Sequence, residues 1–153
     1  MYSGAESVIE KYGDMLFRIA YGYCKNRTDA EDIYQEVICK YLVKKPDFQD
    51  EEHEKAWLIR VTINISKNYV CSFWYKNTES IAKEIPSISD EDLFIWETIQ
   101  NLPNKYRIVI YLHYVEGYTL KEIAMILKKK ESTVGTWLVR GKECLRKKWE
   151  EEV

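Results

Sequence analysis

The stretch "TLKEIAMILKKKESTVGTWLVRGKECLRKK", residues 119–148, decides how the C-terminal part of this chain folds. Thr119 and Glu122 have the spacing of a capping box, so a helix is expected to begin directly after Thr119. Apolar residues then recur at three- and four-residue spacing on both sides of the lysines at 128–130. The stretch therefore predicts two helices joined by a tight turn, which is the arrangement of a helix-turn-helix.

The two predicted helices each have an inner and an outer side. The inner side should contain Leu120, Ile123, Ala124 and Leu127 in the first helix and Val134, Trp137 or Leu138, Gly141 and Leu145 in the second. The outer side should contain Lys130, Ser132, Thr133, Gly135, Thr136, Arg140 and Lys142. Small hydroxyl side chains near a helix N-terminus reach base edges, and cations further along hold phosphates. The pattern suits DNA binding, but a helical hairpin with a solvated basic face would show it equally.

The turn itself departs from the usual chemistry of this motif, because three lysines stand where a glycine and an apolar residue are common. A non-glycine residue in a left-handed turn costs on the order of 1 kcal/mol, which a folded domain tolerates. The three positive charges strengthen the interpretation that this end of the chain binds phosphates.

The charge distribution separates the chain into parts. The whole chain has a net charge of -2 and a pI near 5.8, although proteins that hold DNA unaided usually carry a surplus of positive charge. Residues 1–77 sum to -1, residues 78–100 to -5 and residues 101–153 to +4. We therefore predict an N-terminal domain over 1–77, an acidic linker over 78–92 and a basic C-terminal domain over 93–153.

Helical periodicity extends through both predicted domains, so we expect an all-α protein. The inner faces of the first three helices should contain Val8, Tyr12, Met15, Leu16, Ile19 and Tyr23; then Ala30, Ile33, Val37 and Tyr41; then Trp57 or Leu58, Val61, Ile65 and Tyr69. The second helix should begin at a capping box formed by Thr28 and Glu31, and the third near Glu54. Two further helices should bury Leu93, Trp96 and Ile99, and Tyr106, Val109, Ile110, Leu112 and Val115, the latter ending at Gly117.

Two polar surfaces lie opposite the apolar faces of the N-terminal domain. The second helix presents Asp29, Asp32, Gln35 and Glu36, and the third presents Arg60, Asn64, Lys67, Asn68 and Cys71, followed by three aromatic residues at 73–75. Amides and cations beside aromatic rings suit unpaired bases, and an acidic helix suits a basic partner. By composition alone, both surfaces are more simply explained as solvated helix faces.

Catalysis, metal binding and membrane insertion find no support in the sequence. The histidines, His53 and His113, belong to no hydrolase, metal-binding or phosphate-loop motif, so we expect no enzyme, no cofactor and no metal site. The four cysteines form no Cys-x-x-Cys pair, so we expect reduced, partly buried thiols in a cytoplasmic protein. No apolar run reaches the length of a membrane span, and the first residues lack the pattern of a signal peptide.

Four segments in order resemble one known family. They are "DAEDIYQEV" (29–37), "KAWLIRVTINISKNYV" (55–70), "LPNKYRIVIYLHYVEGYTLKEIAMIL" (102–127) and "STVGTWLVRGKECLRK" (132–147). They look like the successive signatures of bacterial sigma factors of the sigma-70 family, in the short two-domain form called the extracytoplasmic-function (ECF) class. The resemblance implies two small helical domains, the second a helix-turn-helix domain of the winged-helix-like sigma C-terminal type.

The resemblance also implies partners and roles. Core RNA polymerase would bind the acidic helix through Asp29, Asp32, Gln35 and Glu36. The minus-ten element of promoter DNA would be captured by Phe48, Arg60, Asn64, Lys67 and Asn68, and the minus-thirty-five element by the outer side of the last helix. An anti-sigma factor would be a further partner. Cys71, Gly135 and Trp137 replace residues that are often basic in the family, and Gly141 replaces a frequent alanine, so the resemblance does not carry over a promoter sequence.

The sequence thus predicts a factor that directs RNA polymerase to specific promoters and assists promoter melting. One alternative is a stand-alone helix-turn-helix transcriptional regulator. The acidic helix, the near-neutral first domain and the absence of an evident dimerisation heptad count against it. A second alternative, a small helical enzyme, is disfavoured because no catalytic site is recognisable.

Overall fold

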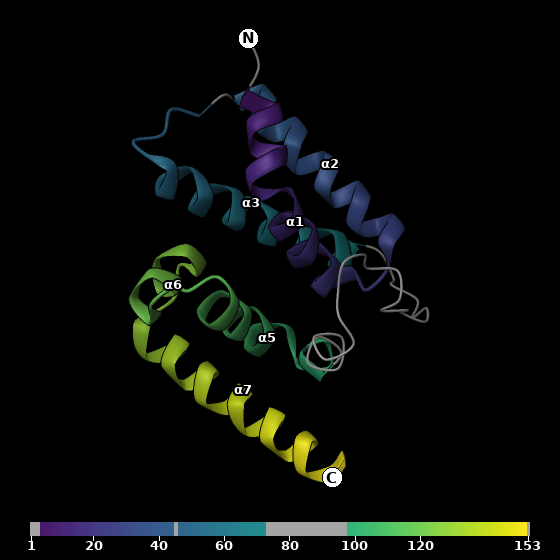
Figure 1. Ribbon diagram of the computed structural model, residues 1–153, viewed down its shortest axis with the longest axis vertical. Coiled ribbons are helices and arrows are strands. Elements are labelled where there is room, and N and C mark those ends of the chain that lie inside the picture. Colours follow the sequence, from purple (N-terminus) through teal and green to yellow (C-terminus); the bar gives the residue numbers. More distant parts are fainter. Residues whose placement is uncertain (1–3, 45, 73–97, 153) are drawn as a thin grey trace. The chain divides into compact units, whose positions relative to one another are not determined.

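The computed structural model describes residues 4–44, 46–72 and 98–152, and it divides the chain into two compact units, Met1–Ile81 and Ala82–Val153 (Figure 1). The predicted linker over 78–92, the aromatic residues at 73–75, and Leu93 and Trp96 lie outside the described residues.

The first unit contains three helices that pack against one another in every pair, namely α1 (Gly4–Cys24), α2 (Arg27–Lys44) and α3 (Glu51–Ser72) (Figure 1). The predicted inner face of α1 is confirmed, and so is the burial of Ala30, Ile33 and Val37 in α2. In α3, Leu58 rather than Trp57 is fully buried, while Val61 and Tyr69 are only half-buried. Because α3 contacts both α1 and α2, it buries more than one stripe, including Ile59, Thr62 and Ile63.

Two helices of this unit begin earlier than the sequence predicted. Lys25 has a left-handed backbone, with φ of 61°, and this conformation ends α1 and puts Asn26 at the start of α2. The Asn26 Oδ1 accepts a hydrogen bond of 2.8 Å from the Asp29 backbone N–H, so Asn26 caps the helix instead of Thr28. Asp50 does the same for α3, because its Oδ1 accepts from the His53 N–H at 2.8 Å.

The second unit contains a helical segment at 98–100, then α5 (Asn104–Ile110), the π-helix η2 (Tyr111–Val115), α6 (Leu120–Leu127) and α7 (Glu131–Glu152) (Figure 1). The single helix predicted over 106–115 is therefore α-helical only in its first part. The wider turn of a π-helix rotates later residues off the predicted face, and Val115 is 55% exposed instead of buried. Gly117, with φ of 79°, follows the end of this helix as predicted.

The core of the second unit lies where α5, η2, α6 and α7 meet. It contains Ile108, Val109, Ile110, Leu112, Ile123, Ala124, Ile126, Val134 and Leu138. Leu120, Leu127 and Leu145, which were predicted to be buried, are half-buried, and Ile126 takes the inner position expected for Leu127. Residues 98–152 include no strand, so the helix-turn-helix has no β-wing among them.

The thiols differ in exposure. Cys24 is buried, Cys144 is half-buried, and Cys39 is exposed, so the expectation of partial burial is wrong for Cys39, which lies on the outer side of α2. All three are free thiols.

None of the helices described here is long and apolar enough to cross a membrane.

Candidate functional site

The helix-turn-helix is built from α6 and α7, and its first helix has the capping box that the sequence predicted. The Thr119 Oγ1 accepts from the Glu122 N–H at 3.1 Å, and the Glu122 Oε1 accepts from the Thr119 N–H at 2.9 Å. These two bonds satisfy backbone donors that a helix start leaves open. The box therefore fixes the residue at which α6 begins.

The turn between the two helices is closed by the backbone. Lys128 adopts the left-handed conformation, with φ of 58° and ψ of 48°, at a position where glycine is the usual choice. The N–H groups of Lys128 and Lys129 both donate to the carbonyl oxygen of Ala124, the latter at 3.0 Å. Since Lys128, Lys129 and Lys130 are all exposed, their charges lie together beside the N-terminus of α7.

The predicted DNA-facing residues of α7 share its outer side. Ser132, Thr136, Arg140 and Lys142 are exposed, and Thr133 and Gly135 are half-buried. The structure adds Val139, which is 58% exposed one helical turn beyond Thr136. Val139 was not among the residues that the sequence predicted to face DNA, yet its spacing from Thr136 places it among the outward residues.

The acidic residues of α2 fall into two groups. Asp32, Gln35 and Glu36 are exposed and lie on one face, and neither carboxylate has an ion-pair partner in the described part of the chain. Cys39 and Val43, the latter 80% exposed, continue this face by one and two further turns. We call Asp32, Gln35, Glu36, Cys39 and Val43 the outer face of α2.

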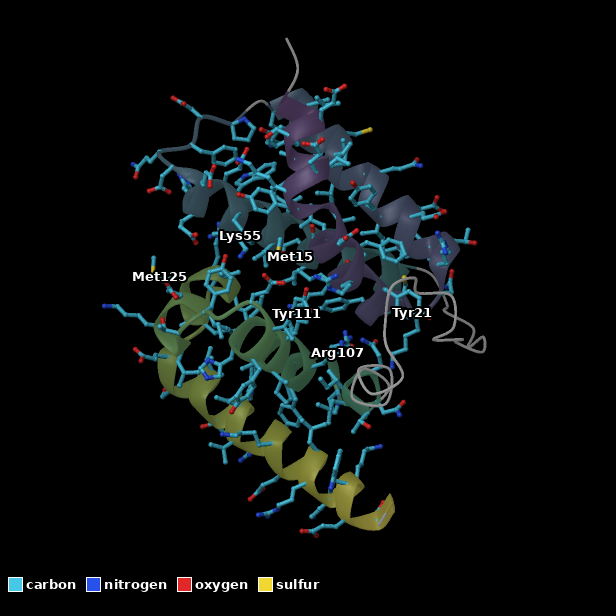
Figure 2. The ribbon with its side chains drawn as sticks, in the orientation of Figure 1. Met15, Tyr21, Lys55, Arg107, Tyr111 and Met125 are labelled. Atoms are coloured by element: carbon cyan, nitrogen blue, oxygen red, sulfur yellow. The ribbon has the colours of Figure 1, made fainter. Side chains whose placement is uncertain are left out.

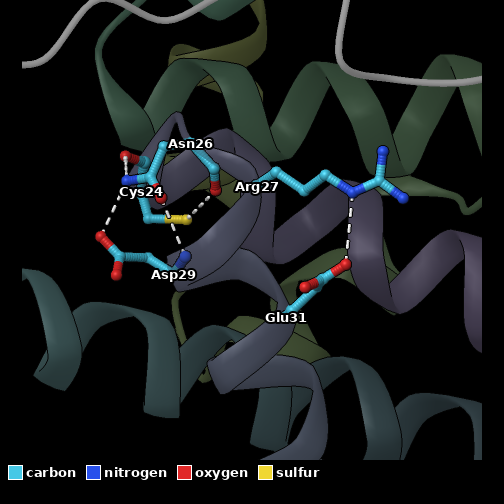
Figure 3. Close-up of polar contacts among 5 residues, drawn as sticks. All are labelled: Cys24, Asn26, Arg27, Asp29 and Glu31. Carbon is cyan, nitrogen blue, oxygen red and sulfur yellow. Dashed lines mark hydrogen bonds and ion pairs between the residues drawn. The ribbon is translucent and has the colours of Figure 1, made fainter.

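Asp29 is placed differently from the other acidic residues, although the sequence grouped it with them. It is half-buried, and both of its carboxylate oxygens accept hydrogen bonds within the unit. Oδ2 accepts from the Asn26 Nδ2 at 2.7 Å (Figure 3), and Oδ1 accepts from the Tyr69 hydroxyl at 2.6 Å. Figure 3 also shows the exposed ion pair of Arg27 with Glu31 on the same helix, at 3.2 Å.

The polar face of α3 is present as the sequence predicted. Asn64, Lys67 and Asn68 are exposed at positions that share one side of the helix, and Arg60 is half-buried one turn earlier. Nothing is described for the side chain of Cys71. These side chains can offer hydrogen bonds and positive charge to a nucleic-acid strand lying along α3.

Phe48, predicted to contact a base, lies in a cluster of aromatic rings between α2 and α3. Its ring is half-buried and stacks on Tyr41 at 6.3 Å between centroids, and it meets His53 at 5.2 Å and Trp57 at 5.7 Å edge-on. The cluster holds the Phe48 ring against residues of both helices. It also leaves only part of the Phe48 ring available to a base.

Among the buried and half-buried groups whose pKa values are raised, Tyr69, Tyr41 and Cys24 have the largest shifts. Burial, with the hydrogen bond to Asp29, raises the pKa of Tyr69, and burial, with the hydrogen bond to Glu54, raises that of Tyr41 to about 12. Burial raises the pKa of the Cys24 thiol to about 11.

His113 has a structural role, since its Nδ1 lies 2.8 Å from the Tyr118 carbonyl oxygen.

Figure 2 shows the side chains of both units, and neither unit presents a cluster of three or more His, Cys, Asp or Glu side chains suited to a metal ion within the described residues. The two units thus present an exposed acidic helix face, a polar helix face with adjoining aromatics, and a capped helix-turn-helix. An exposed acidic helix face can meet a basic partner, and polar and basic helix faces can meet nucleic acid.

Comparison with known proteins identifies the class. Residues 8–72 match the family model "Sigma-70 region 2", and residues 95–145 match "Sigma-70, region 4". The first match covers α2 and α3, and the second covers the helix-turn-helix. The order of the two matches is the order of the two units.

Individual relatives agree with the family models. The chain is 31% identical to the ECF RNA polymerase sigma factor SigW of Bacillus subtilis, over 92% of this chain and 86% of that one. It is 30% identical to the RNA polymerase sigma factor SigV of the same organism, over 86% and 82%. Among solved structures, the fold is similar to the sigma factor RpoE in complex with the anti-sigma factor NepR from Bartonella quintana, with a TM-score of 0.72, 17% identity and coverage of 93% and 94%.

The chain belongs to the ECF sigma factors of the sigma-70 family. Members of this family are transcription initiation factors that give RNA polymerase its promoter specificity. The interpretation as a sigma factor is therefore better supported than a stand-alone regulator.

Proposed function

We propose that the outer face of α2 docks this chain onto a basic surface of core RNA polymerase. The observation that carries the proposal is the exposed set of Asp32, Gln35 and Glu36, whose carboxylates have no ion-pair partner in the described residues. Like charges four residues apart destabilise an isolated helix by about 0.2–0.5 kcal/mol. A basic partner converts this repulsion into attraction and raises the rate of association.

The neighbouring helix α3 then acts on the minus-ten element. Asn64, Lys67 and Asn68 offer amides and a cation to an unpaired strand, and Arg60 extends the positive charge by one turn. Phe48 and the rings around it form an ordered edge against which an unstacked base can lie. Because α2 and α3 pack together, docking through α2 brings this polar face to the DNA.

The helix-turn-helix binds the minus-thirty-five element in the major groove. Thr133, Gly135, Thr136 and Val139 lie at the N-terminal half of α7, where side chains reach base edges, and an exposed valine suits a thymine methyl group. Lys130, Ser132, Arg140 and Lys142 surround them and hold phosphates. In this proposal residues 1–77 and 93–153 are separate domains joined by the acidic linker over 78–92.

Partners and location follow from the same proposal. The factor works with polymerase in the cytoplasm, contributes no catalytic group of its own, and requires neither cofactor nor metal. A protein of similar fold, the sigma factor RpoE from Bartonella quintana, forms a complex with the anti-sigma factor NepR. We propose that an anti-sigma factor likewise restrains this chain.

Transcription with purified components tests the proposal. Sigma-free core polymerase is incubated with genomic DNA, with and without this protein, and the transcripts are sequenced. Discrete transcript starts that depend on the protein are expected. Tight, specific duplex binding without polymerase, accompanied by no new transcripts, would favour the stand-alone regulator instead.

A further inference from the structure

The helices α2 and α3 are linked at both ends by a hydrogen bond from a tyrosine hydroxyl to a carboxylate. At the start of α2, the Tyr69 hydroxyl donates to the Asp29 Oδ1 at 2.6 Å. At its other end, the Tyr41 hydroxyl donates to the Glu54 Oε2 at 2.8 Å. Since α2 and α3 run in opposite directions, each bond joins the beginning of one helix to the end of the other.

The Asp29 end is the more fully connected of the two. Asn26 caps α2 by accepting from the Asp29 N–H at 2.8 Å, and it donates to the Asp29 Oδ2 at 2.7 Å (Figure 3). The Asn26 carbonyl oxygen in turn lies 3.4 Å from the Cys24 Sγ (Figure 3). The Asp29 carboxylate therefore ties together the α1–α2 turn, the first turn of α2 and the last part of α3.

The position of Tyr69 gives this contact a consequence for function. Tyr69 directly follows Asn68 and lies two residues beyond Lys67, and both of these face outward for promoter DNA in the proposed function. Asp29 precedes Asp32 by one turn, and Asp32 is on the face proposed to dock onto polymerase. A directional hydrogen bond of 2.6 Å thus joins the polymerase-binding helix to the DNA-binding end of α3.

We propose that Asp29 and Tyr69 are positioning residues for promoter melting, and that Asp29 acts through Tyr69 rather than as a contact to polymerase. Apolar packing alone brings α2 and α3 together but leaves small sliding and rotation of α3 open. The bond fixes the end of α3 that carries Lys67 and Asn68 while α2 is held on polymerase. This inference rests on the proposed function, since it assigns roles within the same two surfaces.

Paired substitutions separate the two possible roles of Asp29. Asp29→Asn removes the negative charge and keeps one side-chain oxygen that can accept from Tyr69, but it replaces the oxygen that accepts from the Asn26 Nδ2 with an NH2 donor. Tyr69→Phe keeps every charge and removes only the bond. Tyr34→Phe is a matched control, because it removes a hydroxyl from another half-buried tyrosine of this unit without affecting the α2–α3 bond. Thermal melting of each variant verifies that it is folded.

Holoenzyme carrying each full-length variant is assayed for polymerase affinity and for the rate of open-complex formation on a promoter found with the wild-type protein. We expect Tyr69→Phe to bind polymerase within about twofold of wild type and to open the duplex about tenfold more slowly, as for loss of one hydrogen bond to a charged group. A promoter with a premelted bubble should restore its rate. Tyr34→Phe should behave like wild type in both assays, and Asp29→Asn should keep the wild-type affinity for polymerase.

Three outcomes would overturn the inference. They are normal opening by Tyr69→Phe, slow opening that a premelted promoter does not restore, and a loss of polymerase affinity in Asp29→Asn, which would return Asp29 to the docking face. If Tyr69→Phe does not fold, Asp29→Ala is assayed in its place, with the same expectations. Failure of the proposed function is distinguishable, because the wild-type protein would then yield no dependent transcripts at all.

Discussion

Two glycines on α7 differ in the space that a side chain would find beside them. A Cβ added at Gly135 would meet only the Leu120 Cδ1, at 3.8 Å, which is an ordinary contact. A Cβ added at Gly141 would lie 2.7 Å from the Ile110 Cδ1 and 3.2 Å from the Tyr106 Cβ, so α7 approaches α5 more closely than an alanine allows. The first glycine leaves space at the proposed DNA surface, and the second is required by packing.

The two alanine substitutions should therefore change stability in opposite directions. Gly135→Ala should raise the free energy of unfolding by about 0.5–1 kcal/mol, because alanine loses less conformational freedom in a helix. Gly141→Ala should lower it by about 1–2 kcal/mol, because overpacking against buried Ile110 exceeds that gain. Urea denaturation of both variants measures this. A Gly141→Ala variant more stable than wild type would mean that Ile110 moves aside without cost.

Cysteine reactivity provides a second test at the scale of single residues. Reaction requires a thiolate at an accessible position. The Cys24 thiol is buried and its pKa is raised to about 11, whereas Cys39 is exposed on the outer face of α2. Iodoacetamide at pH 8 should modify Cys39 well before Cys24, as read by mass spectrometry of peptides.

Modification of Cys39 with a larger reagent probes docking. Cys39 lies one turn beyond Gln35 and Glu36, so a bulky maleimide at Cys39 should weaken binding to core polymerase. Cys39→Ser protein treated in the same way is the control, because its remaining thiols still react. Equal losses in both proteins would place the effect at another cysteine.

At the scale of helices, local signals in the sequence were sufficient for some features only. The inner face of α1 follows from spacing alone, and the Thr119 capping box follows from two residues three positions apart. The start of α2 was misplaced because Asn26 and Thr28 are both good caps, and the left-handed Lys25 decides between them. The π-helix was missed because a widened turn has no signature in the spacing of apolar residues.

In the candidate site, helical spacing predicts the exposure of most polar residues correctly but not that of Asp29. Exposure of Asp32, Glu36 and Asn64 follows from helical spacing, since each lies opposite an apolar stripe. Asp29 fits the same pattern but is held by Tyr69, which is 40 residues away in the sequence. Helical spacing cannot show whether a carboxylate faces solvent or a hydroxyl group that is distant in the sequence, because this depends on tertiary structure. Spacing therefore groups Asp29, which is half-buried, with carboxylates that are exposed.

The tyrosine–carboxylate bonds between α2 and α3 predict a pH dependence. Burial and these bonds raise the pKa of Tyr69 and raise that of Tyr41 to about 12, from an ordinary value of 10.0. When the pKa of a group is higher in the folded protein than in the unfolded chain, its protonated form stabilises the fold. This contribution is complete below the pKa of the unfolded chain and is lost as the pH rises through the pKa of the folded protein. Stability should therefore fall between pH 10 and about pH 12 as these hydroxyls are forced to ionise.

The double variant Tyr41→Phe/Tyr69→Phe isolates this contribution. At pH 8 it should be less stable than wild type by about 1–2 kcal/mol for each bond, allowing for solvent screening of half-buried groups. Above pH 10 the difference should shrink, because only the wild type has these two protons to lose. Urea denaturation at pH 8 and at pH 11 tests the expectation, and a constant difference would contradict it.

Over the whole molecule, the distribution of charge predicts that DNA binding depends on a partner. Residues 128–148 contain eight Lys and Arg against two Glu, yet the whole chain has a net charge of -2. If four of those cations meet phosphates, the logarithm of DNA affinity falls with the logarithm of salt with a slope of about -3.6. Such binding is weak at physiological ionic strength, so the basic helix becomes effective when polymerase holds the chain near DNA.

Glu36→Lys should therefore abolish transcription without harming the DNA-binding helix. The substitution reverses a charge on the outer face of α2 and relieves the repulsion between Glu36 and Asp32, so the helix should remain folded. Affinity for core polymerase should fall at least about tenfold, because a basic partner then meets a like charge. The affinity of the isolated protein for minus-thirty-five DNA in low salt should be unchanged, with the same salt dependence as wild type.

Co-migration with core polymerase and fluorescence anisotropy with labelled duplex measure the two affinities, and Glu31→Lys on the same helix controls for a general effect of charge. A Glu36→Lys protein that binds polymerase as tightly as wild type would remove the outer face of α2 from the interface.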